Sequence, residues 1–589
     1  MSQASMNRGN WLVVTAIDLG TTFSGYAFSF RSDFEINPLK INTNDWSNEG
    51  VHNAEMKAPS VLLLNPDQSF KSFGYRAQND YTELLEEPEE ASLYYYVKNF
   101  KMQLHNRDIS LNMMLQDISG KEVPALTVFC ESIRYLKDHF LKQFMQRRLS
   151  FTIKDIFFVV TVPAIWSDAA KQFMREASER AGIGSTQMIL AYEPEAAALL
   201  CSLLPEDQGI AKYFQEGRRL MIVDLGGGTA DITVVKVIKR VEKMTYIEHV
   251  YRVTGGAWGA NQVNNNYEVF LNNVLGSDVM DEFKRKYTLQ YIEMMRDFEI
   301  QKKTLSTSGE RRTVGVKLPG ELKELFRNIR KIDIKQALDE KLKDKVKVVG
   351  DKLRIDVSIF KRFFQDCVQQ IIGHINSTFM ERGCAFPSAM ILVGGFSDAP
   401  IIREAIVDAF PVIKDIVSPL ASSLAVLKGS VVFGHQPIIV TGRVCRETIG
   451  VSLQRIFIPE AGKIERTIKI DGKLRADKSF EKMFSVNEII KLGQIRTKEF
   501  QDLHEDKALS FLRTQPKIFE VYSSDEEDPT YITDPGCKLK GMITVNPPNG
   551  KWPKRVEGYI DLETGGTEII VRYRDKHTSH VTEEKINFM

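Results

Sequence analysis

Two short glycine-rich turns, about two hundred residues apart, carry the residue types that can grip a polyphosphate. In segments 14–28 and 220–235 an apolar run ends at an aspartate, a glycine and threonine turn follows, and a second apolar run closes a β-hairpin pattern. Glycine lets the backbone approach a ligand and donate N–H groups without a Cβ in the way. Asp18 and Asp224 would repel a phosphate directly, so they indicate a hard cation such as Mg²⁺, which usually keeps several waters. Two such hairpins facing each other predict a clamp around a polyphosphate and its metal.

The segments around the first turn alternate between strand and helix patterns. Apolar runs at 59–64, 155–163 and 188–191 predict strands, and the helical spacing of apolar residues predicts a long helix over 126–149. Ser167 or Asp168 can cap the next helix. Pro194 suits the first turn of another helix, and we expect it to hold Glu193 outside the helical conformation. This alternation predicts α/β layers.

The pattern is interrupted later in the chain and then resumes. A lysine-rich stretch over 322–353 predicts a solvated, partly helical insertion. A helix over 357–380, a strand over 389–393 and a Gly394-Gly395 turn follow. Beyond Gly434, short β-prone stretches separated by Pro, Gly and Asp clusters predict a mostly β module, with its boundary near 435–437.

The composition of the 589 residues excludes several classes of protein. Balanced charges, 78 basic against 77 acidic, give no overall attraction to nucleic acid or to acidic membranes. The six scattered cysteines show neither metal-ligand nor disulfide-dense spacing, so we expect reduced thiols and a cytoplasmic location, with the nucleus as the alternative. The N-terminal segment does not have the pattern of a signal peptide, and we expect no membrane span.

Five motifs resemble, in this order, the nucleotide-binding domain of the 70-kDa heat-shock chaperones. They are Asp-Leu-Gly-Thr-Thr at 18–22, Val-Pro-Ala at 162–164, Glu-Pro-x-Ala-Ala-Ala at 193–198, Asp-Leu-Gly-Gly-Gly-Thr-x-Asp at 224–231 and Leu-Val-Gly-Gly at 392–395. Segments 24–27, 99–102 and 443–446 are more similar to a divergent branch of that superfamily, the heat shock 70 kDa protein 12 type. One glycine turn would be a weak signal, whereas five motifs in the family's order are specific.

The resemblance implies an α/β fold in which a two-lobed, actin-like (ribonuclease H-like) ATPase domain precedes a smaller, mostly β C-terminal domain. We expect the nucleotide-binding domain over 11–435, with lobe I at about 11–217, lobe II at about 218–435 and the lysine-rich insertion near 310–354. The C-terminal domain, 437–589, resembles a reduced substrate-binding module without the family's helical lid. The family's leucine-rich linker is also missing after Gly434.

The resemblance assigns residues of both turns to ATP and its metal. The residues that it assigns to phosphate binding are Gly20, Thr21, Thr22, Phe23, Gly226, Gly227, Gly228 and Thr229. Asp18 and Asp224 would orient the water shell of Mg²⁺, and a turn-capping role is the alternative for each. The catalytic candidates are Glu193, Lys101, Asp18, Asp224 and Thr229.

Two of these candidates have distinct chemical roles. Glu193 would position or deprotonate the attacking water, and a plain helix-start carboxylate is the alternative. Lys101 would place positive charge near the γ-phosphate, although Lys98 fits the same role and either lysine could instead lie on the surface.

The family's nucleoside contacts match less completely. The implied contacts are Glu299, Lys302, Lys303, Ser306, Gly255, Gly256, Gly394 and Gly395. The first four have i, i+3, i+4, i+7 spacing, which predicts one helical face, and a solvated ion-paired face would have the same pattern. Asp398 stands where the family has an arginine that packs on adenine, so we expect altered nucleotide affinity, and Phe396 is the candidate for a replacement aromatic face.

The leading hypothesis is a heat-shock-70-like, chaperone-like protein of the stress response that binds Mg-ATP between its lobes and hydrolyses it slowly. The nucleotide would control binding of a protein partner or client through the C-terminal β domain. One alternative is a non-hydrolysing adaptor that uses nucleotide as a structural or switching ligand. A second alternative is a small-molecule kinase, for which the sequence offers no sugar or carboxylic-acid pocket.

Overall fold

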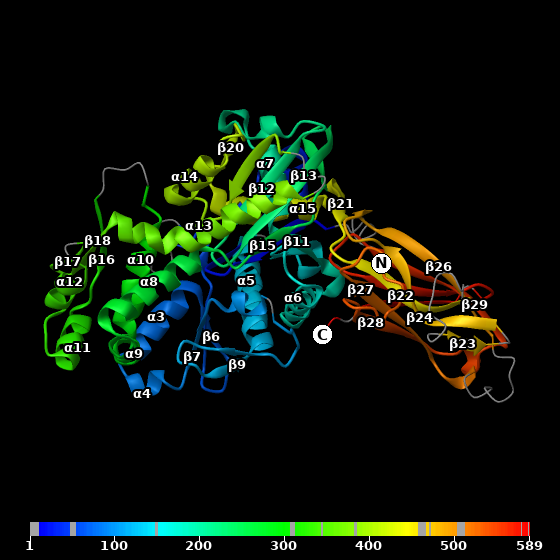
Figure 1. The fold of residues 1–589 in the computed structure, drawn as a ribbon, viewed down its shortest axis with the longest axis horizontal. Coiled ribbons are helices and arrows are strands. Elements are labelled where there is room, and N and C mark those ends of the chain that lie inside the picture. The colour runs from blue at the N-terminus through cyan, green and yellow to red at the C-terminus, as the bar shows by residue number, and fades with distance from the viewer. Residues whose placement is uncertain are drawn as a thin grey trace.

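The computed structural model describes residues 11–46, 55–105, 107–147, 151–306, 312–342, 345–381, 386–456, 467–470, 473–503, 513–578, 580–586 and 588. Helices and parallel strands occupy the left and centre of the view in Figure 1, and a strand-rich part extends to the right. The five described cysteines are free thiols, and Cys384 lies outside the described residues.

The first glycine turn joins two antiparallel strands of a six-stranded sheet, as its pattern predicts. The strands of this sheet are β1 (Val13–Leu19), β2 (Phe23–Phe30), β3 (Asn42–Thr43), β4 (Ala58–Pro59), β10 (Ile156–Val162) and β11 (Met188–Tyr192). β10 runs parallel to β1, and β11 runs parallel to β10. Every residue of β1, β10 and β11 is buried, which explains why these strands are nearly continuous apolar runs.

The second glycine turn joins the central strands of an eight-stranded sheet. Its strands are β12 (Arg219–Leu225), β13 (Ala230–Val241), β14 (Met244–His249), β15 (Thr254–Gly256), β19 (Ala389–Val393), β20 (Ile416–Val417), β21 (Val440–Val444) and β25 (Ile489–Lys491). β19 runs parallel to β12 and β20 parallel to β19, as β10 and β11 do in the first sheet. The two sheets therefore repeat one topology, a hairpin followed by two parallel strands.

The helices repeat in the same order. In the first half, α5 (Ala125–Arg147) precedes β10, α6 (Asp168–Arg180) follows it, and α7 (Glu193–Leu203) follows β11. In the second half, the corresponding helices are α13 (Val357–Met380), α14 (Pro400–Ala409) and α15 (Ala425–His435). The predicted helices at 126–149 and 357–380 and the strand at 389–393 are thus confirmed, although 148–149 lie outside the described residues.

Helices α7 and α15 pack against each other in the core between the two sheets (Figure 1). A Cβ built on Gly429 of α15 would overlap the carbonyl oxygen of Ala196 in α7, so only glycine permits this approach. Gly429 therefore permits the close approach of α15 to α7 in the core between the two sheets.

The lysine-rich segment contains more regular structure than we predicted. It forms a three-stranded antiparallel sheet with two helices, β16 (Thr313–Lys317), α11 (Gly320–Arg330), α12 (Ile334–Leu342), β17 (Val346–Val349) and β18 (Lys352–Asp356). Leu322, Phe326 and Leu353 are buried in the core of the second half. The expectation of a solvated insertion is therefore wrong in this respect, because the apolar positions between the lysines face inward.

The remaining described elements of residues 11–435 surround the two sheets. They are α2 (Arg31–Ile36), β5 (Val61–Leu64), β6 (Phe70–Phe73), α3 (Gly74–Leu84), α4 (Pro88–Ala91), β7 (Tyr95–Lys98), the 3₁₀ helix η2 (Phe100–Leu104), β8 (Met114–Gln116), β9 (Glu122–Pro124), α8 (Ala260–Leu275), α9 (Ser277–Lys286) and α10 (Thr288–Lys302). Among the helices of the described residues, none combines the length and the apolar character that a bilayer-spanning helix needs.

Residues beyond β21 form two further sheets. The five-stranded sheet contains β22 (Thr448–Ile456), β23 (Thr467–Ile470), β24 (Lys473–Phe484), β27 (Lys517–Ser524) and β28 (Lys538–Val545). The four-stranded sheet contains β26 (Gln494–Leu503), β29 (Arg555–Thr564), β30 (Ile570–Asp575) and β31 (Val581–Lys585). Side chains of both sheets, including Val521 and Tyr573, share one core. We call these sheets the C-terminal strands.

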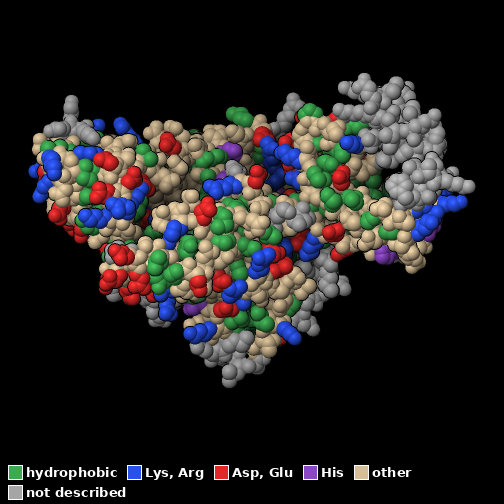
Figure 2. Space-filling view, turned by 90° about the horizontal axis from the view of Figure 1, so that it is seen from below, with side chains coloured by type: hydrophobic (Ala, Val, Ile, Leu, Met, Phe, Trp, Pro, Cys, Tyr) green, Lys and Arg blue, Asp and Glu red, His purple; other side chains and the backbone are tan. Residues whose placement is uncertain are grey.

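The face of the molecule in Figure 2 carries Lys and Arg side chains interspersed with Asp and Glu, without a large region of one sign. This distribution agrees with the balanced composition of the chain.

Candidate active site

The two glycine turns meet face to face. A Cβ built on Gly227 would lie 2.5 Å from Thr22 Oγ1, and one built on Gly228 would lie 2.6 Å from Thr21 Oγ1. Only glycine therefore fits at these two positions while the two turns remain this close to each other. The structure therefore brings together the two segments that we predicted to hold the phosphates.

Hydrogen bonds within the protein take up the carbonyl oxygens of the second turn. The backbone N–H groups of Gly259, Ala260 and Asn261, at the start of α8, donate to the carbonyls of residues 228, 226 and 227 over 3.0, 3.1 and 2.8 Å. Because these acceptors are occupied by the start of α8, they do not face a ligand between the turns.

The first turn is held in a similar way by one serine. Ser60 donates from its N–H to the carbonyl of Thr22 over 2.9 Å and from its hydroxyl to the carbonyl of Gly20 over 2.7 Å. In both turns, therefore, backbone carbonyl groups that would repel a phosphate accept hydrogen bonds from the protein.

Asp18 lies at the end of β1 and is fully partnered. Lys57 Nζ donates to its Oδ2 over 2.7 Å, and Thr161 Oγ1 donates to its Oδ1 over 2.7 Å. Burial opposes ionisation, but the charge of Lys57, followed by that of Lys101, lowers the pKa of Asp18 below its usual value. The sequence analysis missed Lys57, which lies outside every motif, in the segment that leads to β4.

Asp224 lies at the corresponding end of β12 but has no such partner. It is 5% exposed and forms no hydrogen bond or ion pair with any residue that the structure describes. Burial, followed by the charges of Glu193, Asp231 and Asp18, raises the pKa of Asp224 well above its usual value. A buried carboxylate among other carboxylates is costly unless a cation compensates it.

Asp231 faces Asp224 across the second hairpin. The two residues lie directly opposite each other in the β12–β13 register, so their side chains share one face. Asp231 Oδ1 accepts a hydrogen bond from the N–H of Ile165 over 3.0 Å. Burial raises the pKa of Asp231, opposed by a hydrogen bond from Thr229. Asp231 belongs to the motif at 224–231, and no role was predicted for it, although the hairpin register pairs it with Asp224.

Glu193 and Lys101 form a second ion pair, whose charges act on these aspartates. Lys101 Nζ, in η2, donates to Glu193 Oε1 over 2.5 Å, and the side chains are 4% and 12% exposed. Burial raises the pKa of Glu193 to about 7; Lys101 opposes the shift, and Asp18 and Asp231 add to it. Burial opposes the charge on Lys101, but Glu193 and then Asp18 keep its pKa above the usual value.

The alternative lysine lies elsewhere. Lys98 Nζ is 6.0 Å from the ring centroid of Tyr291. Burial lowers the pKa of Lys98, and the carboxylates that oppose this shift are Glu299 and Glu268. Helix α7 already includes Glu193 as its first residue, and the extended conformation that we expected there occurs one residue earlier, at Tyr192, where φ is −76° and ψ is 130°. The expectation that Pro194 excludes Glu193 from the helix is therefore wrong, because a following proline biases the conformation without forbidding it.

The charges of this cluster do not balance. Asp18, Glu193, Asp224 and Asp231 face two lysines, Lys57 and Lys101. In the described part of the chain no three Asp, Glu, His or Cys side chains are placed to hold a metal ion directly. Oxygen donors that act through water suit Mg²⁺, so the donor set fits a hydrated divalent cation.

The predicted nucleoside face is only partly present. Helix α10 ends at Lys302, so Ser306 lies beyond it and does not continue the face that the spacing predicted. Ser306 donates instead to Glu404 over 2.6 Å. The prediction that the four residues share one helical face is therefore wrong for Ser306, because α10 ends four residues before it.

The other residues of that set lie close to α8 and to the first turn. Asn264 donates to Glu299 over 2.8 Å and accepts from Lys302 over 2.6 Å. Burial lowers the pKa of Lys302 to about 8. Lys303 Nζ lies 5.5 Å from the ring centroid of Phe23, so the end of α10 reaches the first turn.

The turn after β19 departs from the expectation for Phe396. This ring is 4% exposed and stacks on Phe364 at a centroid distance of 6.4 Å. Phe396 therefore belongs to the core and offers no open face to adenine, which corrects the prediction. Asp398 accepts a hydrogen bond from Ser422 over 2.7 Å, and burial raises its pKa.

The two glycine pairs predicted near the nucleoside lie against the carboxylates. A Cβ built on Gly394, where φ is +85°, would overlap Asp224 Oδ1. Gly255 pairs with Asp231, and Gly256 pairs with Ala230, across β15 and β13. Both pairs therefore lie beside the aspartates of the second hairpin.

Comparison with known proteins points to one family. Residues 89–319 match the family model described as Hsp70 protein. Heat shock 70 kDa protein 12A of Mus musculus is 29% identical over 98% of this chain and 92% of its own length. Heat shock 70 kDa protein 12B of Homo sapiens is 30% identical over 99% of this chain and 92% of its own length. A chaperone protein HscA homologue of Shewanella putrefaciens is 23% identical over 43% of this chain and 33% of its own length.

Proposed function

The chain belongs to the 70-kDa heat-shock protein family, in the branch of heat shock 70 kDa proteins 12A and 12B, and we propose that it binds Mg-ATP between two lobes and hydrolyses it slowly. In this proposal lobe I comprises about residues 11–217, lobe II comprises about residues 218–435, and the C-terminal β domain comprises residues 437–589. The observation that carries this proposal is the unpartnered buried carboxylate of Asp224 between two facing glycine turns.

The residues of the turns have distinct roles in this proposal. Gly20, Thr21, Thr22 and Phe23 bind phosphate from one side, and Gly226, Gly227, Gly228 and Thr229 bind it from the other. A bound Mg²⁺ ion supplies the positive charge that the phosphates and the aspartates require. Asp224 and Asp231 orient its waters on the second-lobe side, whereas Asp18 acts through its pair with Lys57.

The proposed hydrolysis uses the ion pair of Glu193 and Lys101. A carboxylate with a pKa of about 7 can accept a proton from water near neutral pH. Lys101 fixes Glu193 and places a buried positive charge beside the site where negative charge develops. Lys302, Lys303 and Glu299 are the proposed nucleoside contacts from the second lobe.

The proposal includes control of a protein partner through the C-terminal β domain. One segment supports such coupling, because Ile165 donates to Asp231 while the carbonyl of the next residue, Trp166, accepts from Arg446 over 3.1 Å. A change of charge at Asp231 can therefore be felt where the C-terminal strands begin. Exposed apolar side chains on β27 and β28, such as Ile518 and Leu539, provide contact area for a partner.

The test is Mg-ATP binding and single-turnover hydrolysis by the full-length chain, with Asp224→Asn and Glu193→Gln as variants. We expect Asp224→Asn to weaken Mg-dependent binding, and Glu193→Gln to keep binding while hydrolysis falls ~10²–10⁴-fold. Glu206→Gln, at an exposed carboxylate outside both glycine turns, is the matched control. A parent chain that neither binds nor hydrolyses ATP would refute the proposal.

A non-hydrolysing adaptor is the second candidate. It is favoured by the ion pair between Lys57 and Asp18, because this pair neutralises one of the two aspartates proposed to act on Mg²⁺. It predicts tight nucleotide binding together with a turnover that Glu193→Gln leaves unchanged. The same experiment therefore separates the two candidates.

A further inference from the structure

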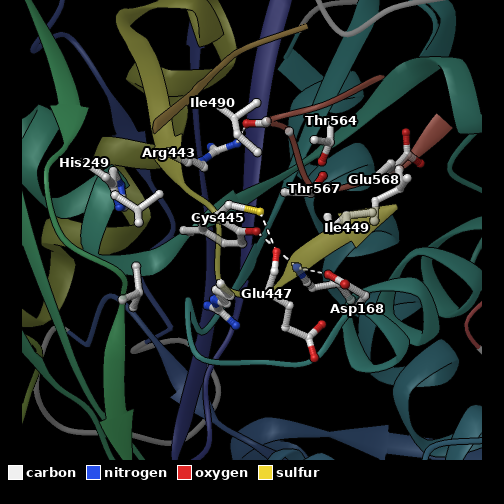
Figure 3. A pocket seen from close by; sticks show the side chains of 18 of the residues that line it. Asp168, His249, Arg443, Cys445, Glu447, Ile449, Ile490, Thr564, Thr567 and Glu568 are labelled. Atoms are coloured by element: carbon white, nitrogen blue, oxygen red, sulfur yellow. Dashed lines mark hydrogen bonds and ion pairs between the residues drawn. The ribbon is translucent and has the colours of Figure 1, made fainter. Parts of the chain in front are cut away.

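A cavity of about 360 Å³ lies where the start of α6 and the end of β11 meet β21 and the C-terminal strands, and no residue of the two glycine turns lines it. Its wall includes Asp168 and Lys171 from the N-terminal half, and Arg446, Glu447 and Glu568 from the C-terminal half. Figure 3 shows Asp168, Glu447 and Glu568 reaching the cavity from separate segments of the chain. Its volume lies at the lower end of the range for small-molecule sites.

Most of the charges in this wall are paired. Lys171 lies 2.5 Å from Asp168, Lys540 lies 2.6 Å from Glu447, and Glu568 lies 2.8 Å from Arg175. Arg443 donates to both oxygens of Glu195 over 2.6 and 2.7 Å. These pairs leave the wall neutral except for Arg446.

Arg446 is the wall's unmatched cation. One of its N–H groups donates to the carbonyl of Trp166 over 3.1 Å, and no carboxylate of a described residue lies within ion-pair distance of its guanidinium. A guanidinium has five N–H donors in a planar fork that matches a carboxylate or a phosphate. Lys171 adds a buried ammonium, which donates to Asp168 and to the hydroxyl of Tyr192 and has a third donor.

We propose that this cavity binds a small organic anion through a carboxylate or phosphate group held by Arg446. The unmatched charge favours an anion, and the neutral pairs around it limit the ligand to one strongly charged group. The volume favours a small molecule over a folded partner. The wall comes from both halves of the chain, so the bound anion also holds the C-terminal strands against α6 and the end of β11.

Calorimetric titration and thermal unfolding of the full-length chain test this site with two probes, inorganic phosphate and malonate, against chloride at matched ionic strength. We expect saturable binding of at least one probe and a higher unfolding temperature. The probe that binds more tightly identifies the phosphate or the carboxylate class. Titration in the presence of Mg-ADP separates this site from the glycine turns, because the anion should still bind there.

Two variants of opposite effect make the test specific. Arg446→Met should weaken binding tenfold or more, whereas Glu447→Gln should tighten it, because Lys540 then loses its carboxylate partner. Arg218→Met, at an exposed arginine just before β12, is the matched control and should bind like the parent. If Arg446→Met fails to fold, Glu447→Gln still decides the outcome. Equal affinity in the parent and in the folded variants, or no saturable binding, would overturn the proposal.

Discussion

Lys101 Nζ lies 2.5 Å from Glu193 Oε1, and this buried pair connects the 3₁₀ helix η2 to the first residue of α7. Both charges are largely removed from water, so each depends on the other and on the aspartates nearby. The pair therefore couples the protonation of Glu193 to whatever cation enters the cluster.

We predict that hydrolysis rises with pH through about 7, because only the carboxylate form of Glu193 accepts a proton and burial raises its pKa to about 7. Single-turnover rates measured from acidic to basic pH should increase and then level off. Glu193→Gln should remove this rise, and Glu206→Gln should preserve it. A rate that does not change with pH in the parent chain would contradict a role for Glu193 as base.

We predict that Lys57→Met destabilises the protein by about 3–5 kcal/mol, because it leaves the buried charge of Asp18 unpaired. Urea unfolding at neutral pH measures the change, and Mg²⁺ should restore part of it. Lys40→Met, which breaks an exposed pair with Asp33, should change stability by less than about 1 kcal/mol.

The same variant has a predictable pH dependence. Lys57 lowers the pKa of folded Asp18 below 3.8, so the stabilisation is present above that value and is lost as the pH falls through the folded pKa. Lys57→Met should therefore weaken the loss of stability in acid. An acid unfolding profile identical to that of the parent would show that the pair contributes nothing.

We predict that Gly228→Ala lowers ATP affinity about tenfold or more, because the added methyl group lies 2.6 Å from Thr21 Oγ1 and overlaps Met102 Sδ. Fluorescence titration with a nucleotide measures the affinity, and Met102→Ala in the same chain should restore part of it. Gly373→Ala, where an added Cβ meets nothing within 4 Å, is the control. Unchanged binding by Gly228→Ala would argue against contact between this turn and the phosphates.

We predict that Arg443→Met costs about 3–5 kcal/mol and exposes the junction with the C-terminal strands to protease, because the buried Glu195 loses its guanidinium partner and retains His249 Nε2, 2.8 Å from its Oε1. Urea unfolding and limited proteolysis measure these effects. Replacing both partners, Glu195→Met with Arg443→Met, should recover much of the loss. Burial opposes ionisation, but Arg443 lowers the pKa of Glu195 to about 2, so this stabilisation is complete above pH 4.5 and falls towards pH 2.

Local patterns were sufficient to predict the hairpins, α13 and β19, because each is specified by a contiguous apolar run or by helical spacing. Asp18, Asp224 and Glu193 were found for the same reason, since each lies in a short motif. Their roles stay predictions until nucleotide binding is measured.

Long-range contacts were not predictable in this way. Lys57 reaches Asp18 across 39 residues, and Arg443 reaches Glu195 across 248, and neither separation leaves a mark in local sequence. The role of Phe396 was predicted wrongly because its burial depends on Phe364, a residue of helix α13 that is distant in the sequence. The sheet of the lysine-rich segment was missed because charged residues alternate with its inward-facing ones.

Strand β21 runs parallel to β14 in the eight-stranded sheet, and β25 pairs with its other edge. Truncating the chain near residue 436 would therefore remove two strands, β21 and β25, from the eight-stranded sheet. The edge of β14 would then be unpaired, which favours self-association. A shortened version for crystallisation or biophysics should retain β21 and β25. Mechanical load applied to the far end of this protein would reach the strands beside Asp231 through backbone hydrogen bonds.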